Sequence, residues 1–85
     1  MSVTIAPTAP DTLREFLMAC RDRISVSQER VAIEVGVSGR HYGALERGQV
    51  RNPNPVLVNR VAEVLRMSEA EQERMQCLLQ ALPAA

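Results

Sequence analysis

Apolar residues recur every three or four positions in five short stretches of this 85-residue chain, and this spacing constrains the fold more than any other feature. A period near 3.6 places such residues on one face of an α-helix, whereas a half-buried strand would alternate with a period of two. No stretch shows convincing alternation. A chain of this length makes one domain with one small core. The sequence therefore predicts an all-α fold, a compact bundle of five short helices.

Each stretch follows a residue whose side chain can cap a helix N-terminus. These caps are Asp11 or Thr12, Ser27, Ser38, Asn54 and Ser68. They precede an expected first helix of about three turns and further helices at about 28–35, 39–47, from Pro55 to about 65, and at about 69–82. Gly36 and Gly48 are expected to end the second and third helices, because glycine readily adopts the left-handed backbone conformation.

Composition and targeting signals narrow the class of protein. The chain is 46% hydrophobic, which indicates a folded domain rather than a disordered segment. The longest apolar run, 16–20, is far shorter than a membrane span, and the first ten residues do not resemble a secretory signal. We expect a flexible arm at 1–10, the domain at 11–82 and a tail at 83–85, in a cytoplasmic protein with no membrane partner.

Catalysis and metal binding find little support in the sequence. His41 is the single imidazole, and a serine or cysteine nucleophile needs a positioned base. Cys20 and Cys77 are far apart and form no metal-ligand spacing, so we expect no enzyme, no metal and no cofactor. A disulfide between the two cysteines stays open, although two buried free thiols are the favoured expectation.

Charge is balanced over the whole chain but not along it. All ten basic residues are arginine, and ten acidic residues oppose them. Residues 39–60 hold four arginines and one glutamate, a local charge of +3, whereas residues 61–85 hold four glutamates and two arginines, a local charge of −2. The neutral total argues against binding of any polyanion through bulk charge, but it conceals a basic half that suits phosphate contacts.

The segment from Gln28 to Gly48 has the spacing of a helix-turn-helix. Ala32 is small enough for two helix axes to approach closely, and Gly36 permits the tight turn between them. Val37 follows as an apolar pin, and Tyr42 and Leu45 would anchor the second helix, with Glu46 also directed inward. The residues left outside on that helix are Gly39, Arg40, His41, Gly43, Ala44 and Arg47.

The stretch QERVAIEVGVSGRHYGALERGQ resembles the helix-turn-helix of Cro and the phage repressors, known as the XRE family. The later stretch NPNPVLVNRVAEVLRMSEAEQERMQCLL is similar to the actinobacterial MmyB-like branch of that family. The resemblance covers about residues 12–82. It implies a lambda-repressor-like five-helix bundle that binds double-stranded DNA and regulates transcription, usually as a homodimer on a pseudo-palindromic operator.

The resemblance also implies roles for particular residues. Positions in the third helix would read base edges in the major groove, namely Gly39, Arg40, His41 and Ala44. Positions around the motif would contact phosphates, namely Gln28, Ser38, Arg47, Arg51 and Asn52. Arg40 suits bidentate bonding to guanine, with a phosphate contact or plain solvation as alternatives. For His41, too, a phosphate contact or plain solvation is the alternative to a base contact. For Gln28 the alternative is an ordinary role as a capping residue. Gly39 has no side chain with which to contact a base.

Two structural expectations and one alternative function complete the sequence interpretation. The resemblance implies a structural role for Glu46, which would pair in the core with an arginine, Arg21 or Arg23, or with a backbone N–H. The last helix carries an apolar stripe suited to core packing or to a dimer interface, formed by Met75, Leu78, Leu79 and Leu82. The alternative function is a protein-interaction module that keeps the helix-turn-helix fold and binds a protein partner in place of DNA.

Overall fold

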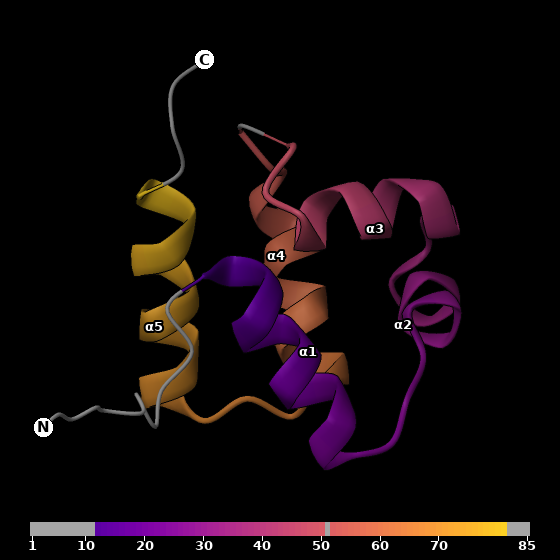
Figure 1. Cartoon of the computed structure of the whole chain (residues 1–85), viewed down its shortest axis with the longest axis horizontal. Coiled ribbons are helices and arrows are strands. Elements are labelled where there is room, and N and C mark those ends of the chain that lie inside the picture. Colours follow the sequence, from indigo (N-terminus) through magenta and orange to yellow (C-terminus); the bar gives the residue numbers. More distant parts are fainter. Residues whose placement is uncertain (1–11, 51, 82–85) are drawn as a thin grey trace, which may run out of the picture.

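The computed structural model describes residues 12–50 and 52–81, and within these ranges the chain folds into five α-helices and no strand (Figure 1). The helices are α1 (Leu13–Arg23), α2 (Gln28–Val35), α3 (Gly39–Glu46), α4 (Pro55–Val64) and α5 (Glu69–Gln80). The predicted all-α five-helix bundle is therefore confirmed. The expected arm at 1–10, the tail at 83–85 and the candidate residues Asp11, Arg51 and Leu82 lie outside the described residues.

Every helix begins at a residue that the sequence marked as a cap. The side chains of these residues accept a hydrogen bond from a backbone N–H of the first turn, and the caps are Thr12, Ser27, Ser38, Asn54 and Ser68. At α5 the Glu71 carboxylate also accepts from the Ser68 N–H, at 2.9 Å, which completes a capping box. Local side-chain chemistry therefore places all five helix starts.

Four of the five helices end in the same left-handed turn. In each turn one residue has a positive φ, and the next amide donates to a carbonyl five positions back in the chain. The positive-φ residues are Ser25 (57°), Gly36 (83°), Gly48 (75°) and Arg66 (56°). Gly36 and Gly48 confirm the predicted stops. Ser25 and Arg66 adopt a conformation that a side chain disfavours, because their Cβ approaches the carbonyl oxygen.

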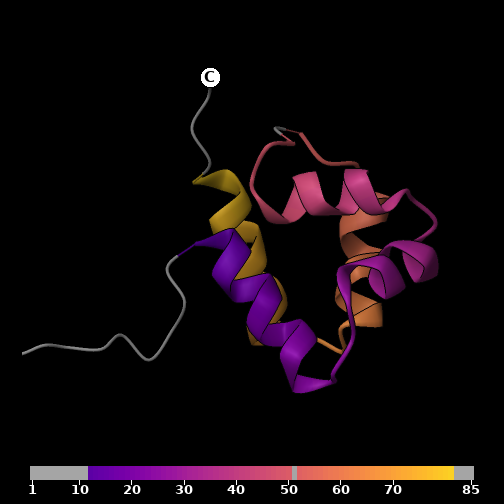
Figure 2. The same ribbon diagram turned by 45° about the vertical axis from the view of Figure 1, so that its right-hand side comes forward.

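The bundle closes around one apolar core to which all five helices contribute. α1 and α5 lie side by side, and α2 packs on α3 and α4 (Figures 1 and 2). Leu17, Val31 and Val61 are fully buried at the centre. The two cysteines are both free, but they differ, since Cys20 is buried and Cys77 is exposed on α5. The expectation of two buried thiols is therefore wrong for Cys77.

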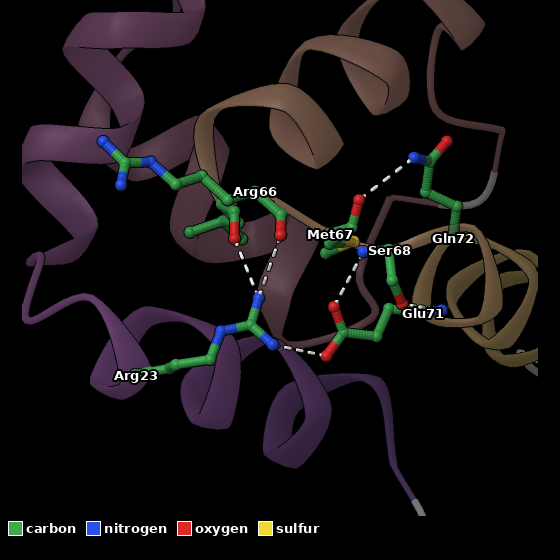
Figure 3. Close-up of polar contacts among 7 residues, drawn as sticks. Arg23, Arg66, Met67, Ser68, Glu71 and Gln72 are labelled. Atoms are coloured by element: carbon green, nitrogen blue, oxygen red, sulfur yellow. Dashed lines mark hydrogen bonds and ion pairs between the residues drawn. The ribbon is translucent and has the colours of Figure 1, made fainter.

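Arg23 fastens the end of α1 to the link between α4 and α5 (Figure 3). Its Nη2 donates to the carbonyl oxygens of Leu65, at 3.0 Å, and Arg66, at 3.3 Å, which are left without partners where α4 ends. Its Nη1 pairs with the Glu71 carboxylate at 2.5 Å. The same carboxylate holds the capping box with Ser68, so one arginine connects three helices.

Candidate nucleic-acid interface

α2, the turn and α3 form a helix-turn-helix. The Val37 N–H donates to the Ala32 carbonyl at 3.0 Å across the turn, and Gly36 between them is left-handed. Ala32 is buried, and Val37 packs half-buried on the core. The Ser38 Oγ then accepts from the His41 N–H at 3.0 Å and starts α3. The predicted uses of alanine, glycine, valine and serine at these positions are confirmed.

α3 runs along the periphery of the bundle, with the other helices on one side of it (Figures 1 and 2). Tyr42, Leu45 and Glu46 are buried and fix the helix to the core. Arg40 and His41 are exposed, as is Gly39, where an added Cβ would meet Glu29 of α2 at 3.9 Å. The structure therefore separates an anchoring face from an outward face on a helix of eight residues.

The outward face differs from the sequence prediction at two positions. Gly43, expected outside, is buried, and Ala44 is half-buried. The atoms nearest to this position belong to Arg47, whose Nη1 would lie 3.1 Å from a Cβ added at Gly43, and to Gln28, whose Oε1 would lie at 3.7 Å. Positions four residues apart share a helix face, so the arginine folds back over the glycine. The sequence signal for the burial of Gly43 was an arginine four residues later. Helical spacing alone did not indicate that the side chain of Arg47 points back toward Gly43.

Glu46 is the single buried charged side chain among the described residues. The Arg21 Nε donates to its carboxylate at 2.6 Å and Nη2 at 3.3 Å, and the Gln28 Nε2 donates at 2.8 Å. Of the two expected partners, Arg21 is the one that binds Glu46, and Arg23 binds Glu71 instead. A carboxylate without water needs such donors, so this network ties α1, α2 and α3 together.

Two titratable groups in the core are held in their neutral forms. Burial, followed by the nearby Glu46 carboxylate, raises the pKa of the Tyr42 hydroxyl. Burial also raises the pKa of the Cys20 thiol, and the charge of Glu71 adds to that effect. A thiolate is the reactive form of cysteine, so burial in the core and a raised pKa both suit Cys20 to packing.

The expected phosphate-contact residues lie in different environments. Ser38, Arg47 and Asn52 are exposed, while Gln28 is half-buried with its amide bonded to Glu46. Gln28 is also the first residue of α2, where the leading N–H groups have no partner inside the helix. The structure brings Gln28 and Arg47 together at Gly43, since both approach the same point beside that glycine. This pairing was not predicted from the sequence.

Among the described residues, no group of three or more histidine, cysteine, aspartate or glutamate side chains is arranged to hold a metal ion. None of the described helices combines the length and the apolar character that a membrane span requires. A hollow of about 450 Å³ lies at the C-terminal end of α4, and its lining includes Ile24, Arg30 and Glu63.

The fold and the two-faced α3 define a class, the all-α helix-turn-helix domains. Comparison with protein families agrees, because residues 12–75 match the model of a helix-turn-helix domain. The chain belongs to this family, whose members are typically DNA-binding modules without catalytic activity. No curated protein and no solved structure matched the chain significantly.

Proposed function

We propose that the protein is a sequence-specific, double-stranded DNA-binding transcriptional regulator of the XRE branch, close to the MmyB-like group, with α3 in the major groove. The supporting observation is the arrangement of α3, in which buried Tyr42 and Leu45 anchor the helix while Arg40 and His41 are exposed at the periphery. The major groove is about 12 Å wide and accepts one α-helix.

Arg40 is the residue that we assign to base readout. Its exposed planar guanidinium can donate two hydrogen bonds to O6 and N7 of guanine. His41 follows it on the first turn of α3 and would meet a base edge or a phosphate. Ala44 lies one turn beyond Arg40, half-exposed, where its methyl group would contact a thymine methyl, and Gly39 would contribute through backbone proximity alone.

Phosphate contacts would hold α3 in register without reading sequence. We assign them to Ser38, Arg47 and Asn52, which are exposed, and to Gln28 at the start of α2. Arg51, which lies outside the described residues, would add a further positive charge next to Asn52 in the sequence. Glu46, the only acidic residue of the segment 39–60, is buried and paired with Arg21, so the exposed charge of that segment is positive.

We infer a homodimer on a pseudo-palindromic operator, because one short recognition helix reads only a few base pairs. Two half-sites would then lie one helical turn, about 34 Å, apart. The interface would lie elsewhere than on the predicted α5 stripe, because Met75 and Leu78 are buried in the core and Leu79 packs against it. Duplex DNA as partner would place the protein in the cytoplasm.

Selection of binding sites from random duplexes with the full chain tests this function. An enriched motif with two-fold symmetry is the expected result. Binding should also weaken steeply with salt, because each neutralised phosphate releases counterions. If no motif is enriched and no binding occurs at low salt, the DNA-binding function is refuted and the alternative, a protein-interaction module, becomes the better account.

A further inference from the structure

The guanidinium of Arg47 occupies the space that a side chain at Gly43 would fill. A Cβ built on Gly43 would lie 3.1 Å from the Arg47 Nη1 and 3.8 Å from its Cζ. Contacts as short as 3.1 Å are rare for a Cβ, so a side chain at this position would require the guanidinium to shift by at least a few tenths of an ångström. The missing side chain therefore creates a seat for the arginine on the backbone of α3.

Two amide oxygens surround this seat. The Gln49 Oε1 accepts from the Arg47 Nε at 3.4 Å, and the Gln28 Oε1 lies 3.7 Å from the Cβ position of Gly43. The orientation of the Gln28 amide follows from Glu46, because a carboxylate only accepts and must face the Nε2 group. The oxygen of Gln28 is thereby turned toward the side on which the guanidinium lies.

We propose that Gly43 is a positioning residue for DNA binding, which seats the Arg47 guanidinium against α3 beside Gln28 for contact with a backbone phosphate. The proposal rests on the function proposed above. A guanidinium has five N–H donors in a planar fork, so donors directed away from the seat remain for phosphodiester oxygens. A side chain held near its bound position loses less freedom on binding, which increases affinity.

Stability and binding should respond in opposite directions when this glycine is replaced. Alanine favours a helix interior more than glycine does, so Gly43→Ala should keep or raise the thermal midpoint of unfolding. The same change displaces the guanidinium by a few tenths of an ångström. Gly43→Leu places a larger side chain at the same position and should displace the guanidinium further. A purely structural role for Gly43 predicts no loss of binding in a variant that is equally or more stable.

The test measures binding of the full chain to a mixed-sequence duplex over a salt series, with thermal unfolding of every variant. The variants are Gly43→Ala, Gly43→Leu, Arg47→Ala, and Gly43→Leu combined with Arg47→Ala. Arg30→Ala is the matched control, since it also removes one exposed arginine but lies at the hollow near the C-terminal end of α4. Sequence-independent DNA suffices because phosphate contacts do not depend on the bases.

Arg47→Ala should make the negative slope of log K against log salt less steep by about 0.9, which is the contribution of one phosphate contact. Gly43→Leu should make the slope less steep by a similar amount, and Gly43→Ala by less. Neither substitution should lower the thermal midpoint of unfolding. Adding Gly43→Leu to Arg47→Ala should change nothing further, because the seat is then empty.

Wild-type binding by Gly43→Leu, together with a loss in Arg47→Ala, would overturn the positioning role and leave the DNA-binding function intact. A further loss when Gly43→Leu is added to Arg47→Ala would also overturn it. Absence of binding by the wild-type chain at low salt would instead refute the proposed function itself, and the positioning role with it.

Discussion

The buried pair between Arg21 and Glu46 should dominate the response of this domain to single substitutions. Side-chain exposure is 13% for Arg21 and 1% for Glu46, and the arginine supplies two of the three hydrogen bonds that the carboxylate accepts from side chains. Arg21→Met keeps the apolar stem but removes both donors. Glu46 is then left as a buried carboxylate with the Gln28 amide as its remaining side-chain donor.

Breaking one side of a buried pair costs about 3–5 kcal/mol, because the remaining charge is uncompensated. A domain of this length has a total stability of about 4–13 kcal/mol, so Arg21→Met should lose much of it. The thermal midpoint should fall by more than about 12 °C, given about 4 °C or more per kcal/mol. Replacing both partners removes both charges, so Arg21→Met with Glu46→Met should lie within about 1 kcal/mol of the wild type.

Urea and thermal unfolding, followed by far-ultraviolet circular dichroism, measure this difference. Arg14→Met is the matched control, because Arg14 is exposed on the same helix, and its change should stay within about 0.5 kcal/mol. The reasoning is refuted if Arg21→Met costs less than about 1 kcal/mol, or if the double variant is as unstable as the worse single one. Either result would mean that Glu46 does not depend on Arg21 for its burial.

Three further outcomes are expected. Arg40→Ala should leave stability within about 0.5 kcal/mol, since the side chain is exposed, but reduce discrimination between the selected site and a one-base variant by about 1–3 kcal/mol in competition binding; unchanged discrimination would contradict base readout. Bonds from Arg23, then from the Ser68 backbone, hold the pKa of Glu71 below its usual value, so this stabilisation is present above the unfolded pKa and is lost as pH falls through the folded pKa. Glu71→Gln keeps the capping box, so unfolding at a series of pH values should show a wild-type advantage at neutral pH that begins to decline near the ordinary glutamate pKa of about 4.3 and is lost as the pH falls through the lowered folded pKa; a constant difference would exclude the charge as its cause. Ser25→Gly should raise the free energy of unfolding, measured in urea, by up to about 1 kcal/mol, because the backbone of Ser25 is left-handed. A lower free energy of unfolding would show that the strain at Ser25 is negligible.

Local chemistry made the helices and the motif predictable. A cap acts through its own side chain on an amide two or three residues away, so Ser27, Ser38 and Ser68 could be assigned from sequence. The left-handed turn at Gly36 and the small residue at Ala32 are equally local. The apolar spacing then indicated which side of each helix would be buried, and Arg40 and His41 were placed outside for that reason.

Contacts between distant residues were not predictable in the same way. The sequence allowed either Arg21 or Arg23 as the partner of Glu46. The left-handed turns at Ser25 and Arg66 contain no glycine at the left-handed position, so the sequence did not predict them. The exposure of Cys77 depends on how α5 packs on α1. The partner of Glu46 and the exposure of Cys77 depend on the relative placement of two helices, which helical periodicity does not specify.

Gly43 shows most directly which features followed from the sequence and which followed from packing. Periodicity placed it on the outer face of α3, yet the residue is buried, with side-chain atoms of Arg47 and Gln28 beside it. The amino-acid order alone established a five-helix, two-faced helix-turn-helix, since caps, turns and amphipathic spacing act within a few residues. Packing alone brought Arg47, Gln28 and Glu46 to one junction, because side-chain direction depends on neighbours supplied by other helices.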